Sequence, residues 1–388
     1  MPTERLYYTD AYCTRFTATV VDATDGGTRV YLDRSAFYPT SGGQPFDLGT
    51  LGGVAVRDVV DEEDRVAHLL AAPLAPGTAV EGEVDWARRF DLMQQHTAQH
   101  LLSAVFADRY GWPTVSVHFG DASATLDLDV GQVDAAVLRE AERQANAIVT
   151  ENRPVEVSFE DAATATGLRK ASGRTGTLRI VSIAGLDRSA CGGTHVRHTG
   201  EIGVILLRKV ERVKKQVRVE FLAGGRAVQR ARQDQELLAT LAAGFSAGAE
   251  EVPALVEGQR AQLKEAEALR RTLVEQLAGY RLRELHAGAT PDAGGVRRIT
   301  YAAQPGDDLR ALGQAATQLA GTVFLATSEA PPTILLATSA DSGVDAGAVL
   351  KAALGAAGGR GGGSPRLAQG TVPDAAALAA VRARVAGS

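Results

Sequence analysis

The sequence predicts an α+β protein built from several domains, and three observations lead to this prediction. The chain has 388 residues, and because a domain usually takes about 100–200 residues, we expect two or three compact units. Short alternating apolar runs bounded by glycine-rich turns, which are typical of strands, recur between segments whose apolar residues follow helical spacing. A long stretch rich in Ala, Leu, Gln, Glu and Arg separates two such mixed regions.

Composition excludes several classes of protein. Two cysteines cannot form a disulfide framework, and no apolar run reaches the roughly 18 residues that a membrane-spanning helix requires. The N-terminal sequence lacks the apolar segment of a signal peptide, so we expect a cytoplasmic protein with no membrane partner. The formal net charge of −5 does not by itself indicate a nucleic-acid-binding protein.

Residues 1–89 are expected to form a small β-barrel or a β-sandwich. Runs such as TRFTATVVDA and RVYLDRSAFY alternate apolar and polar residues, and the turn signals DGG, SGG and LGG separate the runs. Glycine and proline recur too often for a helical alternative.

Residues 90–225 are expected to form an α+β domain. Helical spacing begins near Phe90 and ends before Gly111 and Pro113. A second, amphipathic helix is expected over residues 131–152. Strands are expected in TVSVHFGDASATLDLDV, PVEVSFE, TLRIVSI and IGVILLRKVERVKKQVRVEFLAG.

Residues 226–288 are expected to form a helical linker with the pattern of a coiled coil in its second part. Gly244, Gly248 and Pro253 are expected to break this segment into two helices. Its apolar positions suit either a homodimer or internal packing between domains.

Residues 289–388 are expected to form a mixed α/β domain. Strands are expected in GTVFLATS and PTILLATS, and helices in GAVLKAALGAAGG and DAAALAAVRARVA. The glycine-rich run at 358–370 is, by itself, typical of a flexible linker.

Two short motifs predict a metal site. His96 and His100 are four residues apart on the first predicted helix, so both imidazoles face the same side. Cys191 and His195 flank two glycines that permit a tight turn back toward one ion. Three nitrogens and one sulfur suit tetrahedral Zn²⁺, one ion per chain. The zinc is expected either to have a purely structural role or to keep an open coordination position for catalysis.

The residue after His96 argues against a zinc protease of the HExxH type. That motif needs a glutamate there as general base, and this chain has Thr97.

HTAQH followed by CGGTH resembles the editing domain shared by alanyl-tRNA synthetases and free-standing alanyl-tRNA editing proteins, the AlaX family. Three further segments carry the resemblance: AFYPTSGGQPFDLGTL at 36–51, TGEIG after the second motif, and GGRGGGSPRLAQG at 358–370. The first is similar to the family's N-terminal barrel, and the last is similar to the DHHA1 domain of alanyl-tRNA synthetases.

The resemblance implies a domain order. It assigns residues 1–89 to the N-terminal β-barrel, 90–225 to a zinc-containing editing (deacylase) domain, 226–288 to a helical linker and 289–388 to a DHHA1-like RNA-binding domain. No aminoacylation domain is expected, because the chain begins at the barrel segment.

The resemblance also implies an activity. We expect a long-form trans-editing hydrolase that deacylates mischarged tRNA(Ala), with Ser-tRNA(Ala) as the main substrate and Gly-tRNA(Ala) as a second candidate. His96, His100, Cys191 and His195 would act through zinc, which activates water or orients the ester. One alternative is a non-catalytic RNA-binding protein with a structural zinc, and another is a hydrolase of a small-molecule ester.

Several residues are candidates for the substrate pocket. Ser41, Gly42, Gly43 and Gln44 are expected to line it, because glycines let the backbone approach a small substrate closely; the alternative is a β-turn of the barrel. Thr97 is a candidate hydroxyl contact and could equally belong to the core. The remaining candidate is His118, which faces either the ester or solvent.

Basic residues near the second motif and in the glycine-rich run are candidate contacts to tRNA phosphates. The alternative is a solvated charged surface. The candidates are Arg169, Lys170, Arg174, Arg208, Lys209, Lys214, Lys215, Arg360 and Arg366. The expected partners are therefore the acceptor end of tRNA(Ala) and a second copy of the chain, through the helical segment or the C-terminal domain.

Overall fold

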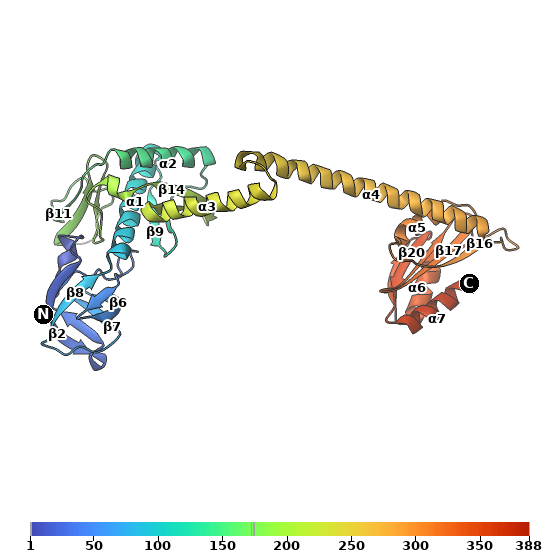
Figure 1. Ribbon diagram of the computed structural model, residues 1–388, viewed down its shortest axis with the longest axis horizontal. Coiled ribbons are helices and arrows are strands. Elements are labelled where there is room, and N and C mark those ends of the chain that lie inside the picture. Colours follow the sequence, from blue (N-terminus) through green and yellow to red (C-terminus); the bar gives the residue numbers. More distant parts are fainter. Residues whose placement is uncertain (1, 172, 174, 388) are drawn as a thin grey trace. The chain divides into compact units, whose positions relative to one another are not determined.

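The computed structural model describes residues 2–171, 173 and 175–387. The chain divides into two compact units, Met1–Thr240 and Leu241–Ser388, and each is described by itself (Figure 1). None of the helices in the described residues is long and apolar enough to cross a membrane.

The first unit begins with a closed β-barrel. The strand order around it is β2-β3-β7-β6-β5-β8. In β2 and β8 every second side chain is buried, as the alternation in the sequence requires, and these side chains fill the barrel interior. A short parallel pair, β1 with β4, lies beside it. The elements are β1 (Glu4–Arg5), β2 (Arg15–Thr24), β3 (Arg29–Leu32), β4 (Arg34–Ser35), β5 (Gly49–Leu51), β6 (Val54–Glu62), β7 (Arg65–Leu70) and β8 (Ala79–Val84), with 3₁₀ turns η1 (Leu6–Tyr8) and η2 (Asp25–Gly27).

Helix α1 (Trp86–Tyr110) leads from the barrel into the rest of the unit (Figure 1). Asp85 caps its N-terminus by accepting a hydrogen bond from the backbone N–H of Arg88, at 3.2 Å. Gly111 ends it in the left-handed conformation, with φ of 69°. The central turns of α1 are buried on nearly every side, which makes this helix the core of the unit.

Two sheets and a second helix surround α1. One sheet has the order β14-β15-β10-β9 and the other the order β11-β12-β13. Helix α2 packs against α1 and β14. The bounds are β9 (Thr114–Phe119), β10 (Ala124–Leu128), α2 (Ala135–Thr150), β11 (Val155–Asp161), β12 (Thr177–Ile183), β13 (Asp187–Ala190), η3 (Thr199–Ile202), β14 (Ile205–Val213), β15 (Gln216–Ala223) and α3 (Gly224–Gly244).

A buried ion pair joins the barrel to α1. The side chains of Asp47 and Arg89 are both fully buried, and Arg89 Nε donates to both carboxylate oxygens at 3.0 Å. Arg89 also donates to the backbone carbonyls of Ala11 and Ala36, and the backbone N–H of Tyr38 donates to Asp47 at 2.6 Å. Because each charge has several partners, the pair offsets its own desolvation cost and fixes the barrel on the helix.

The second unit is a three-layer α/β domain preceded by a long helix. Its sheet has the order β16-β17-β18-β20-β19, and within the described strands of this sheet only the β16–β17 pair is parallel. Alternate residues of β17 and β18 face opposite layers, α6 with α7 on one side and α4 with α5 on the other. The bounds are η4 (Ala249–Glu251), α4 (Val252–Gly288), β16 (Arg297–Ala302), α5 (Leu309–Ala316), β17 (Thr322–Glu329), β18 (Pro332–Thr338), α6 (Ala346–Ala356), β19 (Arg360–Gly363), β20 (Leu367–Thr371) and α7 (Ala375–Ala386).

The helical segment 226–288 divides into two helices as expected, because α3 ends at Gly244 and α4 begins at Val252. Pro253 lies in the first turn of α4, where a proline costs no hydrogen bond. One local expectation needs correction. The glycine-rich run is not a flexible linker, because it forms the antiparallel pair β19–β20. A Cβ on Gly370 would lie 2.2 Å from Leu354 Cδ1 of α6, so glycine there lets the helix pack on the sheet.

The ion pair gives a testable prediction about stability. Asp47→Asn leaves the Arg89 guanidinium buried without a counter-charge, so we expect the free energy of unfolding of the first unit to fall by about 3–5 kcal/mol. The two tryptophans, Trp86 and Trp112, both lie in this unit, so urea denaturation followed by tryptophan fluorescence reports on it. Glu83→Gln, which breaks the exposed pair with Arg15, is the control and should leave the midpoint unchanged. Equal effects of the two variants would contradict this account of the pair.

Candidate metal centre and adjoining cavity

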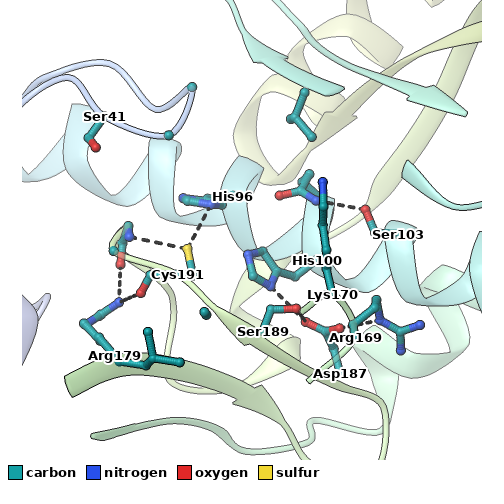
Figure 2. Close-up of a pocket in the computed structure, with 18 of the residues that line it drawn as sticks. Ser41, His96, His100, Ser103, Arg169, Lys170, Arg179, Asp187, Ser189 and Cys191 are labelled. Atoms are coloured by element: carbon teal, nitrogen blue, oxygen red, sulfur yellow. Dashed lines mark hydrogen bonds and ion pairs between the residues drawn. The ribbon is translucent and has the colours of Figure 1, made fainter. Parts of the chain in front are cut away.

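Four side chains from two distant segments meet beside α1. His96 and His100 extend from α1, and Cys191 lies in the loop that follows β13 (Figure 2). His195 belongs to the same loop. Their donor atoms all lie within 4.8 Å of one another. Cys191 Sγ is 3.5 Å from His96 Nε2 and 3.4 Å from His195 Nε2. The structure therefore brings the four predicted ligands into one group that could hold a metal ion.

The barrel fixes the orientation of the His96 ring through Gln44. The backbone N–H of Thr194 donates to Gln44 Oε1 at 3.1 Å, and Gln44 Nε2 donates to the Thr194 hydroxyl at 2.8 Å. Since an N–H can only donate, the atom that it meets is the amide oxygen. The same oxygen lies 2.8 Å from His96 Nδ1, so Nδ1 carries the proton and Nε2 keeps its lone pair.

Thr97 fixes the His195 ring in the same way. The Thr97 hydroxyl donates its proton to the backbone carbonyl of Met93 at 2.8 Å, which is the turn below it in α1. His195 Nδ1 lies 3.1 Å from this hydroxyl oxygen and must therefore donate to it. The lone pair of His195 is again on Nε2, the atom that faces Cys191.

A carboxylate fixes the third ring. His100 Nδ1 lies 2.9 Å from Asp187 Oδ2, and the carboxylate also accepts hydrogen bonds from Ser189 and from Arg169 Nε, the latter at 2.5 Å. Arg169 is itself held by Asp108 at 2.7 Å. Hydrogen bonding of the distal imidazole nitrogen to a carboxylate is the usual support of a metal-binding histidine.

Burial and charge set the protonation of the group. Burial raises the pKa of the Cys191 thiol, but the neighbouring His96 and His195 rings outweigh this and lower the pKa well below its usual value. Burial lowers the pKa of His100, but Asp187 and Cys191 raise it to about 10. Burial, together with the neighbouring His96 ring, lowers the pKa of His195 to about 3. Cys191 is therefore favoured as a thiolate, which is the form that binds a metal.

The donor set fits a metal ion. Three imidazoles direct their Nε2 atoms at a common space, where a metal would displace the second proton of His100, and a thiolate adds negative charge and a soft donor. This combination suits a borderline-soft transition metal in tetrahedral coordination.

The loop Cys191–His195 is held close to α1 by its glycines and by Arg179. A Cβ on Gly193 would lie 2.2 Å from the His96 ring, so only glycine fits there. Arg179 on β12 is buried, and its guanidinium donates to the backbone carbonyls of Tyr8, Cys191 and Gly193 at 2.7–2.9 Å (Figure 2). The loop is therefore fixed before any ligand binds.

A cavity of about 1150 Å³ opens beside the metal-binding group. Its lining includes His96, His100 and Cys191, so three of the four donors are reached from it, whereas His195 lies behind them. Figure 2 shows this wall with Ser41 on the barrel side. The cavity is also lined by Tyr8, Gly42, Gly43, Gln99, Ser103, Thr114, Phe159, Lys170 and Arg179.

Some of the predicted pocket residues line the cavity and others do not. Ser41, Gly42 and Gly43 line the cavity as expected from the sequence. Gln44 and Thr97 do not, because both are buried behind the metal-binding rings and orient them. The last candidate, His118, is exposed on β9 and lies outside the cavity lining, so its predicted contact with the ester has no support here.

The basic residues predicted to contact phosphates differ in their surroundings. Arg169 lines the cavity, but two carboxylates hold its guanidinium, so its role is to position Asp187. Lys170 lines the cavity and makes no hydrogen bond or ion pair within the described residues. Arg174 lies outside the described residues.

The other basic residues are not among those that line the cavity. Arg208 and Lys209 on β14 pair with Glu220 and Glu211. Lys214 and Lys215 are exposed at the turn between β14 and β15. In the second unit, Arg360 is exposed on β19, and Arg366 donates to the backbone carbonyl of Thr317.

Sequence reasoning missed Asp187, and it gives Arg179, one of the basic residues before the second motif, the role of a candidate phosphate contact rather than that of a support for the loop. A signal for Asp187 was present, since Asp187, Ser189 and Cys191 alternate along β13 and its end and so share one side of the strand. Nothing in the sequence pattern around Arg179 distinguishes it from a surface arginine.

Comparison with known proteins agrees with this architecture. The family model described as "Threonyl and Alanyl tRNA synthetase second additional domain" matches residues 178–219, and the DHHA1 domain model matches residues 297–387. The fold and site thus define a protein of the alanyl-tRNA synthetase editing class, whose first unit holds four side chains that could bind a metal ion.

Named relatives refine this class. An alanine–tRNA ligase of Methanoregula boonei is 34% identical over 402 residues, which cover 96% of this chain and 42% of the ligase. The alanyl-tRNA editing protein Aarsd1 of Bos taurus is 32% identical over 308 residues, covering 74% of this chain and 69% of that protein. The Aarsd1 of Rattus norvegicus is 34% identical over 241 residues, covering 57% and 58%. The chain belongs to the family of alanyl-tRNA editing proteins, and it spans less than half the length of the ligase.

The glycine contact gives a prediction with a control in the same loop. Gly193→Ala places a Cβ against His96 and displaces the ring from Gln44, so we expect affinity for Zn²⁺ to fall about 10–100-fold. Gly192→Ala is the control, because its Cβ would meet only the Tyr8 hydroxyl, at 3.8 Å. Competition with a chromophoric chelator measures both affinities. Equal affinity of the two variants would show that the close contact does not matter.

Proposed function

We propose that this chain is a zinc-dependent aminoacyl-tRNA deacylase that acts in trans on mischarged tRNA(Ala), chiefly Ser-tRNA(Ala) and secondarily Gly-tRNA(Ala). The observation that carries the proposal is the group of four donors, oriented in advance and open to a cavity on one side. The names of the editing relatives support the reaction and the tRNA.

His96, His100, Cys191 and His195 would hold the zinc. When bound, zinc would supply a Lewis acid beside the ester, which lowers the pKa of a water or polarises a carbonyl. Four protein ligands are typical of a structural site, which favours the alternative of an RNA-binding protein with a structural zinc. The exposure of three ligands to the cavity favours catalysis, because a structural site is normally closed on all sides.

The chain itself supplies the remaining groups for ester hydrolysis. Gly42 and Gly43 have positive φ values of 58° and 90°, and a Cβ on Gly42 would meet no atom within 4 Å, so the backbone there is open to a ligand. Arg179 lines the cavity with a charge that no carboxylate neutralises among the described residues. This charge favours negative charge that develops on the ester oxygen.

The end of the tRNA would enter past Lys170 and Phe159. Lys170 lines the cavity without a hydrogen bond or ion pair among the described residues, and Phe159 on β11 is 48% exposed although it is a large apolar side chain. A lysine beside an exposed aromatic ring suits a phosphate next to an unpaired base.

Two further expectations remain proposals. Leucines along α4, including Leu263, Leu273 and Leu277, are more than half exposed, which is consistent with a homodimer through the helical segment. Binding of RNA by residues 289–388 is proposed because this region matches the DHHA1 domain model. A cytoplasmic location is proposed because the N-terminal sequence lacks the apolar segment of a signal peptide.

A deacylation assay tests the proposed function. Purified protein is expected to hydrolyse Ser-tRNA(Ala), to do so more slowly after treatment with a chelator, and to recover when Zn²⁺ is returned. The double substitution His96→Ala with His100→Ala removes two donors and should abolish both zinc binding and turnover. Zinc-loaded protein that binds tRNA(Ala) without hydrolysis would favour the structural-zinc alternative, and hydrolysis independent of tRNA would favour a small-ester hydrolase.

Substitutions of the neighbouring residues Arg169 and Lys170 are expected to have different effects, the first on zinc affinity and the second on tRNA binding. Arg169→Gln releases Asp187, so Zn²⁺ affinity should fall about 10–100-fold with little change in the salt dependence of tRNA binding. Lys170→Gln should leave zinc affinity unchanged, raise KM for aminoacyl-tRNA and reduce the salt slope by about one counterion. Arg57→Gln, on the exposed side of the barrel, is the control. The reverse pattern would contradict the assigned roles.

A further inference from the structure

Positive charge gathers where the hairpin of β14 and β15 turns. Residues 212–216, which we call the hairpin tip, comprise the end of β14, the turn and the start of β15. The basic residues of the tip, Arg212, Lys214 and Lys215, are all exposed. None of them makes a hydrogen bond or an ion pair within the part of the chain that the structure describes, and the tip contains no acidic residue. The tip therefore presents positive charge that the chain itself does not neutralise.

The rest of the hairpin shows the opposite pattern, because each of its basic residues has a carboxylate partner. Arg208, Lys209 and Arg218 pair with Glu220, Glu211 and Asp127, respectively. Ion pairs of this kind satisfy the charges within the sheet. The unpaired positive charge of the hairpin is thus confined to its tip, and a cluster of unpaired cations attracts an anionic partner.

The turn uses a residue that its backbone conformation does not favour. Lys214 has a φ of 59°, in the left-handed region where glycine and asparagine are preferred. A two-residue turn between antiparallel strands usually has Asn, Asp or Gly at such a position. A lysine there costs conformational energy, and its side chain makes no hydrogen bond or ion pair among the described residues to offset that cost. Departures from a local rule are expected at functional positions, which points to a partner outside the chain.

The register of the sheet places the hairpin tip near one end of the cavity. Arg212 pairs with Val217 of β15, which pairs in turn with Leu128 of β10. Leu128 pairs with Thr114 of β9, and Thr114 lines the cavity. Because neighbouring strands are about 4.8 Å apart, this row of residues spans about 14 Å. One large anionic ligand can therefore occupy the cavity and reach the tip at the same time.

An RNA duplex that adjoins the cavity fits this arrangement. The hairpin tip has no aromatic residue on which an unpaired base could stack, so phosphates are the groups it suits. Double-stranded RNA is recognised mainly through its shape and backbone, since its deep, narrow major groove does not admit side chains. The aminoacyl end of a tRNA is a short single strand that continues from the acceptor helix. An aminoacyl ester in the cavity thus brings a duplex close to the tip.

We propose that the hairpin tip binds phosphates of the acceptor helix of the tRNA whose aminoacyl end lies in the cavity. The proposal rests on the deacylase function proposed above. Arg212, Lys214 and Lys215 contact the backbone and no base, so they add affinity that does not depend on the RNA sequence and that falls as salt rises. The tip holds the duplex, whereas the cavity beside Lys170 holds the single-stranded end.

Two double variants that remove equal charge test the proposal. Lys214→Asn with Lys215→Gln removes two charges from the tip and keeps a residue that tolerates the positive φ. Arg208→Gln with Lys209→Gln removes two charges from the paired part of the same hairpin and is the matched control. We expect the tip variant to raise KM for Ser-tRNA(Ala) about 10-fold with kcat unchanged, and to reduce the salt slope of tRNA binding by about two counterions. The control should leave KM and the salt slope at the wild-type values, and equal effects of the two variants would overturn the proposal.

Binding of uncharged RNA separates this inference from the proposed function. The probes are a hairpin RNA that carries the acceptor helix with its single-stranded 3′ end, and a short oligonucleotide with the 3′ end alone. Fluorescence anisotropy should show that the tip variant loses affinity for the hairpin RNA and keeps wild-type affinity for the oligonucleotide. Zinc content and tryptophan fluorescence at wild-type values would show that the variant is folded.

The two proposals can then fail separately. If the tip variant loses affinity for the hairpin RNA alone while the protein hydrolyses no aminoacyl-tRNA, the deacylase proposal fails and the role of the tip stands. Equal losses for both probes, or wild-type affinity for both, would overturn the role of the tip and leave the deacylase proposal intact.

Discussion

Three buried imidazoles must each offer the same nitrogen to one point, and the structure depends on how this is achieved. Each Nδ1–H is engaged by a different kind of acceptor: the amide oxygen of Gln44, the hydroxyl oxygen of Thr97 and the carboxylate of Asp187. These acceptors come from the barrel loop, from α1 itself and from β13. Orientation of the rings therefore requires three parts of the first unit to be correctly assembled, which makes the metal-binding group a property of the unit rather than of two short motifs.

The same constraint explains why the barrel is part of the site. The segment that follows β4 contributes Gln44 to the His96 ring and, three residues later, Asp47 to the buried pair with Arg89. Arg89 and His96 are on the same helix, seven residues apart, so the ion pair and the Gln44 hydrogen bond hold one barrel segment against two turns of α1. A displaced barrel would both leave a charge unpaired in the core and free the His96 ring, so stability and ligand orientation are coupled.

The sequence predicts the four candidate ligands because a four-residue spacing on a helix, and two glycines between a cysteine and a histidine, each place two side chains close together. It does not predict the residues that orient the imidazole rings, because these come from distant parts of the chain. The sequence predicts a pocket role for Gln44 because it follows two glycines, and for Thr97 because of its hydroxyl, but long-range packing directs both to the imidazole rings. Arg169 has the same sequence signature as a phosphate contact, and only the folded chain brings it to Asp108 and Asp187. The run at 358–370 has the composition of a linker, and the close approach of α6 is what makes its glycines necessary for a strand pair.

X-ray absorption spectroscopy of the zinc-loaded protein tests the central claim most directly, namely that three imidazole nitrogens and the Cys191 thiolate meet at one ion. The structure predicts one sulfur at about 2.3 Å and three nitrogen ligands at about 2.0–2.1 Å, with the multiple scattering that oriented imidazoles produce. The sulfur shell should disappear in Cys191→Ser. A spectrum without sulfur, or with oxygen ligands only, would contradict the claim.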